Sequence, residues 1–145
     1  MLLEEKRLGR IDFDRKAVAR DGATTLATLA FEERANEPTL VRLREGTTVR
    51  ARGEFVIDAA TGAVRRTVFE IRQPGFELTL ETTYGRDERM NMWVPVLFTE
   101  RYGTGGRFGS RRPSDPLLLA AEEVIRCEAS YTNYRRFDVT ARIKK

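Results

Sequence analysis

The chain has 145 residues, of which 41% are hydrophobic and 33% charged, a balance typical of a folded domain with a heavily ionised surface. This length fits one domain, 1–145, and no apolar run approaches the ~20 residues of a membrane span. Its 26 Lys and Arg and 22 Asp and Glu are interleaved, so the net charge of +4 does not form the basic face that a nucleic-acid partner needs.

In the first half of the chain, tight turns separate short alternating segments. Asp21-Gly22 is a hairpin dipeptide, so we expect a hairpin whose second arm points Leu29 and Phe31 inward. Val41 and Leu43 then alternate with arginines, which predicts a further short strand.

The alternation strengthens from Val49 onward. The segments 49–58 and 63–72 surround the compact loop Asp58-Ala59-Ala60-Thr61-Gly62, which predicts a hairpin whose polar faces pair arginine with glutamate. Gln73-Pro74-Gly75 predicts a turn. The next segment, 76–84, alternates apolar residues with carboxylates and threonines, which is typical of a strand with one dry face.

The segment 92–102 is the most apolar, and Pro95 within it cannot donate a ladder hydrogen bond. We therefore expect this strand to carry a bulge or to lie at an edge of the sheet, and it is our candidate edge strand. Residues 103–116 predict a long loop, and 124–134 and 137–143 the last strands. Cys127 is the lone cysteine, and its alternation with apolar residues predicts a small buried side chain.

Together these segments predict a mainly β fold. We expect a strongly curved antiparallel sheet, or half-barrel, of about eight or nine strands with little helix. Its concave face should be apolar and its outer face ionic, because the period of two puts alternate residues on opposite faces.

The sequence offers little catalytic chemistry. It contains no histidine, which removes the commonest general base and the usual zinc ligand. Asp12 and Asp14 share a face but lack the further oxygen ligands that calcium requires. The glycine-rich run 103–109 fits neither phosphate-loop pattern, because a phenylalanine stands where the third glycine should be and no lysine follows. We predict that the protein is not an enzyme and has no cofactor and no metal site.

Five segments, in order, carry a family resemblance. They are Phe31-Glu32-Glu33, Pro38-Thr39-Leu40-Val41-Arg42, Arg52-Gly53-Glu54-Phe55-Val56-Ile57-Asp58-Ala59-Ala60-Thr61-Gly62, Trp93-Val94-Pro95-Val96 and Ala129-Ser130-Tyr131-Thr132-Asn133-Tyr134-Arg135-Arg136-Phe137. Over most of residues 25–143, the chain resembles the C-terminal part of a family of uncharacterised bacterial exported proteins. The D-x-x-T-G turn followed by a W-x-P-V strand is also similar, more distantly, to the half-barrel of periplasmic lipoprotein carriers of the LolA/LolB type, which holds an acyl chain.

The resemblance implies an exported, periplasmic protein and brings no catalytic residues. The first residues of this chain lack the apolar core of a secretory signal. A cytoplasmic protein, a mature form and a domain cut from a longer precursor all fit this start, and the resemblance implies that 1–145 is the C-terminal part of a longer precursor.

The concave face supplies the candidate binding site. We expect it to bind an apolar group, such as a lipid or a lipoprotein acyl chain, through residues drawn from Phe55, Ile57, Phe69, Leu78, Leu80, Trp93, Val96, Phe98 and Tyr131. The loop that carries Arg107, Arg111 and Arg112 should lie near the mouth. A simpler alternative is that these apolar residues only pack against one another. A second hypothesis is a protein–protein interaction module of the bacterial envelope that pairs through an exposed edge strand.

Overall fold

The computed structural model describes residues 8–34, 40–42, 46, 48–104 and 123–135. Within them the chain forms nine strands: β1 (Ile11–Asp21), β2 (Thr24–Glu33), β3 (Val41–Arg42), β4 (Thr48–Val49), β5 (Ala51–Asp58), β6 (Val64–Gln73), β7 (Phe76–Asp87), β8 (Met92–Thr104) and β9 (Glu123–Ser130). Seven of them make one open sheet in the order β1-β2-β5-β6-β7-β8-β9, and β3 and β4 pair separately. All pairings are antiparallel, so the prediction of a mainly β, antiparallel fold is confirmed.

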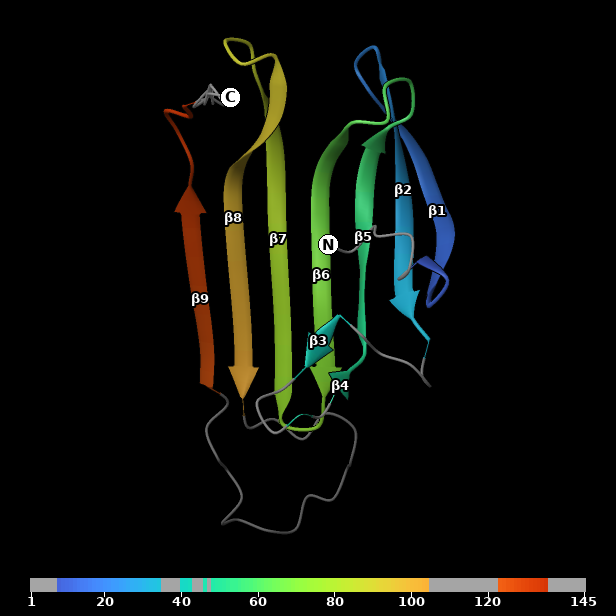
Figure 1. Ribbon diagram of the computed structural model, residues 1–145, viewed down its shortest axis with the longest axis vertical. Helices are drawn as coiled ribbons and strands as arrows, with labels where there is room; N and C mark the ends of the chain where they lie inside the picture. The colour runs from blue at the N-terminus through green and yellow to red at the C-terminus, as the bar shows by residue number, and fades with distance from the viewer. Residues whose placement is uncertain (1–7, 35–39, 43–45, 47, 105–122, 136–145) are drawn as a thin grey trace, which may run out of the picture.

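Figure 1 shows the seven strands side by side, from β9 at the left to β1 at the right. Short turns connect most neighbours, as the sequence predicts. The turns at Gly22, Gly62 and Gly75 each hold glycine at a positive φ, of 59°, 72° and 77°. Other residues adopt this backbone conformation at a cost, which explains glycine at these corners.

The pairing registers divide the sheet into two faces, because directly paired residues point to the same side. One row runs Ala51, Ile71, Leu78 and Tyr102, and the next runs Gly53, Phe69, Leu80 and Glu100. A third row contains Phe55, Thr67, Thr82 and Phe98. We call the side that carries these three rows the apolar face. The opposite side carries Glu32, Arg52, Glu54, Arg66, Glu70 and Glu81, and we call it the charged face.

The most buried packing lies at one end of the apolar face. Val49, Ala51 and Ile71 form a buried cluster, against which Leu40 and Val41 pack. In Figure 1 the β3–β4 pair lies in front of the lower ends of β5 and β6, where this cluster sits. The two short strands therefore cover the sheet at that end.

A buried carboxylate ties this cover to the sheet. Glu33 at the end of β2 has no exposed surface. Its two carboxylate oxygens accept hydrogen bonds from the backbone N–H groups of Leu40 and Ala51, each at 2.9 Å. Charge-assisted bonds of this kind offset the desolvation of a buried carboxylate.

The prediction that β8 forms an edge is wrong, whereas the prediction of a bulge is confirmed. β8 lies between β7 and β9. Its register with β7 shifts where Thr83 pairs with Leu97 but Tyr84 pairs with Pro95, which leaves Val96 as the extra residue. The pairing with β9 begins at Leu97. Pro95 therefore lies where β8 has run past β9, and its missing N–H interrupts no bond between these two strands.

The edges of the described sheet are β1 and β9. β1 contains a bulge between Arg15 and Ala17 and is rich in charged residues. On β9 the side chain of Cys127 is exposed, so the prediction that it is buried is wrong. Alternation with apolar neighbours assigns a residue to a face, but it does not say whether that face is covered.

Candidate functional site

The apolar face brings together seven residues of the predicted binding site, five of which lie in the three rows defined above. The registers place Phe55, Phe69, Leu78, Leu80 and Phe98 on this face, on the four consecutive strands β5 to β8. Each is partly exposed. Phe69 and Leu78 pack against the buried cluster of Val49, Ala51 and Ile71, at the border of the end that Leu40 and Val41 cover. Phe55, Leu80 and Phe98 lie beyond this end.

Phe31 belongs to this group but is missing from the predicted set. Its ring lies 5.3 Å from that of Phe55 and 6.3 Å from that of Phe69, between centroids. It occupies the space above Gly53, because a Cβ at that glycine would come within 2.8 Å of the Phe31 ring. Gly53 on β5, flanked by apolar positions of the same face, is the sequence signal that a large side chain from the neighbouring strand lies over it.

Ile57 and Trp93 also lie on the apolar face, toward the other end of the sheet. Ile57 follows Phe55 by two residues on β5, and Trp93 pairs with Arg86, which has the same alternation on β7 as Leu80. Ile57 pairs with Val64 just after a register shift, which leaves Arg65 as an extra residue on β6. The Arg65 guanidinium stacks on the Trp93 ring at 4.3 Å from its centroid. A cation over an indole gives ~0.5–1 kcal/mol at exposed sites, so this contact favours one orientation of Trp93 by only a few-fold.

Val96 and Tyr131 lie apart from the other predicted site residues. Alternation along β7 puts Gly85 on the charged face, and a Cβ there would come within 2.7 Å of the Val96 side chain. The bulge therefore turns Val96 to the charged face. Tyr131 follows β9, is 43% exposed and donates its backbone N–H to the Val96 carbonyl at 3.0 Å.

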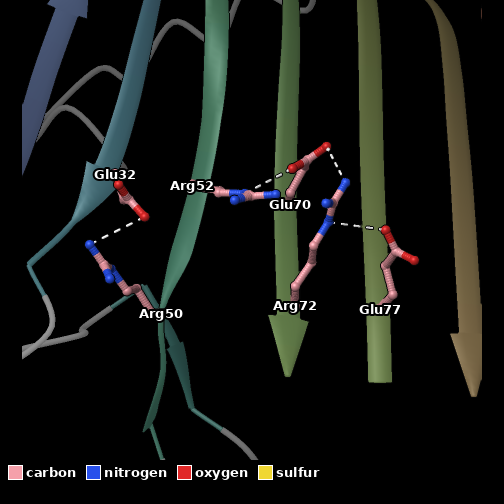
Figure 2. A network of polar contacts seen from close by, with 6 residues as sticks. All are labelled: Glu32, Arg50, Arg52, Glu70, Arg72 and Glu77. Carbon is pink, nitrogen blue, oxygen red and sulfur yellow. Dashed lines mark hydrogen bonds and ion pairs between the residues drawn. The ribbon is translucent and has the colours of Figure 1, made fainter. Parts of the chain in front are cut away.

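The charged face is covered by cross-strand ion pairs. Figure 2 shows Arg52 of β5 bound to Glu70 of β6, while Arg72 of β6 reaches both Glu70 and Glu77 of β7. The distances are 3.0, 3.5 and 3.1 Å respectively. Glu32 and Arg50 form a further pair at 3.2 Å. The predicted pairing of arginine with glutamate across the β5–β6 hairpin is confirmed, and Glu77 lies outside the apolar face as its alternation requires.

A hollow of about 660 Å³ lies over the charged face. Six carboxylates line it, those of Asp12, Asp14, Glu32, Glu54, Glu70 and Glu81, together with the basic groups of Lys16, Arg52 and Arg66. Each carboxylate has a basic partner within 4.0 Å, from Lys16, Arg34, Arg50, Arg52 or Arg66. Each carboxylate in this hollow therefore has a basic partner within the protein, and Arg66 serves two of them.

These ion pairs are partly solvated. Side-chain exposures run from 14% at Glu77 to 68% at Asp14. Exposed pairs contribute ~0–1 kcal/mol each, so the network fixes strand register more than it adds stability.

The predicted loop arginines cannot be placed relative to the apolar face. Arg107, Arg111 and Arg112 of the predicted mouth lie outside the described residues. In the part of the chain that the structure describes, no group of three or more His, Cys, Asp or Glu side chains is placed to hold a metal ion. The same part has no helix that is long and apolar enough to cross a bilayer.

In comparisons with known proteins, no family model, no curated protein and no solved structure matches this chain. The resemblance to exported proteins and to lipoprotein carriers therefore stays a prediction.

Proposed function

We propose that the protein is a non-catalytic binding domain that takes up an apolar group, such as a lipid or lipoprotein acyl chain, on its apolar face. The observation that carries the proposal is the set of large apolar residues on one face of β5 to β8, whose side chains stay partly exposed: Phe55, Phe69, Leu78, Leu80 and Phe98. On the charged face of β5 to β7, by contrast, arginines and glutamates pair with one another.

The energetics fit an acyl chain. Burial of apolar surface contributes about 25 cal/mol per Å², or ~0.8 kcal/mol for each methylene group removed from water. A surface of phenylalanine and leucine makes no directional demand on its ligand, so we expect affinity to grow with chain length and to depend little on the headgroup.

Titration with a fluorescent fatty acid tests this proposal. The wild-type protein should bind the probe saturably, and longer fatty acids should displace it more strongly. Phe98→Ala should weaken binding about three-fold to ten-fold, since it removes apolar contact area from the strip. Leu97→Ala is the matched control, because Leu97 pairs with Thr83 on the opposite face. Absence of saturable binding, or equal losses in the two variants, would refute the proposal.

The second candidate function is an interaction module of the bacterial envelope that pairs through an edge strand. The observation in its favour is β9, an edge strand of the described sheet on which Val124 and Ile125 are 51% and 47% exposed. Exposed edges with apolar side chains are templates for strand addition. Arg126→Pro should abolish capture of a strand-donating partner while leaving fatty-acid binding unchanged.

An extracytoplasmic location is part of this proposal and is supported by the family resemblance. Fractionation of cells that express the natural gene product tests it. Recovery of the protein in the periplasmic or envelope fraction is the expected result, and recovery in the cytoplasm would contradict it.

A further inference from the structure

We infer that β9 pairs with β9 of a second copy of this chain, antiparallel, about a two-fold axis at Cys127. The inference deepens the second candidate function and rests on it, because it names the partner that the exposed edge takes. The apolar-face proposal does not depend on it.

The first observation is that the ion-pair pattern of the charged face stops at this edge. On β5, β6 and β7 the arginines face glutamates, as Arg52 faces Glu70 and Arg66 faces Glu81. On β8 and β9, Arg101 lies directly opposite Arg126, and Glu128 lies opposite Thr99. Within the described residues, neither arginine has an acidic partner. Like charges placed directly opposite each other are unfavourable, so Arg126 needs a carboxylate on its outer side.

The second observation fixes which backbone groups of β9 face outward. The N–H of Tyr131 donates to the Val96 carbonyl of β8. Hydrogen-bonding direction alternates along an antiparallel strand, and the β8–β9 register has no shift. The odd-numbered residues 125, 127 and 129 therefore bond to β8, and the outward backbone groups belong to Val124, Arg126, Glu128 and Ser130.

A second β9 must align its outward residues with these, so even-numbered residues pair with even-numbered ones. With Glu128 of the partner subunit opposite Arg126, symmetry also sets Arg126 of the partner subunit opposite Glu128. The two neighbouring registers that keep even-numbered residues paired are less favourable. One sets Arg126 opposite Arg126 of the partner subunit, and the other sets Glu128 opposite Glu128 of the partner subunit. Cross-strand ion pairs thus select one register.

That register has consequences on the apolar face. Ile125 lies opposite Ala129 of the partner subunit, and Cys127 lies opposite Cys127 of the partner subunit on the axis. Because the N–H of Cys127 points to β8, the two cysteines form a non-hydrogen-bonded pair, with a Cα–Cα distance of about 4.5 Å. This lies within the range of about 4.4–6.8 Å that a disulfide spans.

A charge exchange tests the register. Sedimentation over a wide range of micromolar concentrations should show a reversible dimer for the wild type. Arg126→Glu should weaken it about ten-fold or more, because like charges then meet twice across the interface. Glu128→Arg should weaken it similarly, and the double variant should restore it. Arg126→Glu also gains Arg101 as a partner within its own sheet, so it should fold at least as well as the wild type.

Thiol cross-linking tests the position of the axis. Treatment with diamide, which accepts two electrons and two protons as two thiols become one disulfide, should convert the wild type to a covalent dimer. The control variant carries Cys127→Ser and Val124→Cys. Its thiol is also exposed, but the axis sets it opposite Ser130 of the partner subunit, so it should cross-link far more slowly.

The outcomes separate the inference from the second candidate function. A monomer at all concentrations, failure of the double variant to restore the dimer, or equal cross-linking of the two thiols would overturn the inference. If the monomer still captured a different strand-donating partner, and Arg126→Pro abolished that capture, the second candidate function would stand. Loss of both would remove the edge as a functional surface.

Discussion

At the scale of single residues, Gly53 is the described glycine with the least room for a side chain. A Cβ there would come within 2.0 Å of the Val68 carbonyl oxygen and 2.8 Å of the Phe31 ring. Backbone cannot move away as a flexible side chain can. We expect Gly53→Ala to lower the free energy of unfolding by about 1–3 kcal/mol or more, as overpacking does in cores.

The control for this change is Gly103→Ala on β8. Nothing lies within 4 Å of a Cβ built at Gly103. Alanine also loses less backbone entropy than glycine in a strand, so the variant should match the wild type or slightly exceed it. Urea denaturation of both variants measures the difference, and equal midpoints would contradict the assigned contact between Gly53 and Phe31.

Adjacent residues on β7 should respond in opposite ways to a charge. Leu80→Asp places a carboxylate between Phe69 and Glu100 on the apolar face, where lost apolar burial and repulsion by Glu100 should cost about 1–3 kcal/mol of stability. Glu81→Arg removes a pair with Arg66 on the charged face. An exposed ion pair is worth ~0–1 kcal/mol, so this change should cost little. Circular dichroism during thermal unfolding measures both, and equal tolerance would mean that the faces are inverted.

At the scale of elements, the β5–β6 turn is stabilised by a carboxylate whose protonation depends on pH. The carboxylate of Asp58 accepts the backbone N–H groups of Ala60 at 2.9 Å and Thr61 at 3.2 Å. The Ala60 N–H is the largest cause that lowers the pKa of Asp58, and Thr61 and the positive charge of Arg65 act in the same direction, while burial opposes them. The folded state thus holds this proton less tightly than the unfolded chain does.

The sign of the pH effect follows. A carboxyl group whose pKa is lower in the folded state stabilises it above the unfolded value of about 3.9, and this contribution disappears as pH falls through the folded pKa. Below pH ~4, the stability of the wild type should therefore decline more steeply than that of Asp58→Asn. Urea midpoints measured in steps from neutral to acidic pH provide the comparison. Parallel declines would show that Asp58 does not contribute.

Particular elements show what the sequence can and cannot predict. The period of two assigns Phe69 and Leu80 to one face and Glu77 and Glu81 to the other, because each side chain of a regular strand alternates. The turn that begins at Asp58 could be predicted because few residue types, mainly Gly, Asn and Asp, favour the backbone conformations of tight turns. Edge position was not, since Pro95 is equally compatible with an edge and with a bulge, and strand order depends on contacts far apart in the sequence.

The candidate site was predictable to a smaller extent. Seven of its proposed residues share the apolar face, but Val96 does not, because the bulge beside Pro95 breaks the alternation on which its assignment rested. The exposure of the Cys127 side chain could not be predicted from the sequence either. Whether a face is covered depends on how the other elements pack, and local periodicity contains no information about that.

At the scale of the whole molecule, stability should be graded across the sheet. β5, β6 and β7 are paired on both sides, and the buried cluster of Val49, Ala51 and Ile71 lies at their end. We expect their amides to exchange with solvent most slowly and those of β1 and β9 fastest, since edges open locally. Hydrogen exchange followed by mass spectrometry measures this order. Fastest exchange in β6 would contradict it.

The unlike edges of the sheet also limit how large an assembly can grow. β1 is interrupted by its bulge at Lys16 and flanked by the Lys16–Asp14 and Arg34–Asp12 ion pairs, devices that discourage an incoming strand. β9, the other edge of the described seven-stranded sheet, has neither a bulge in its register nor such flanking ion pairs among the described residues. A sheet with one open edge uses that edge when it dimerises. The edges that remain exposed in the dimer are then the two protected β1 strands. Assembly through β9 therefore stops at the dimer. A sheet with two open edges could instead add subunits at both ends and grow into a fibre.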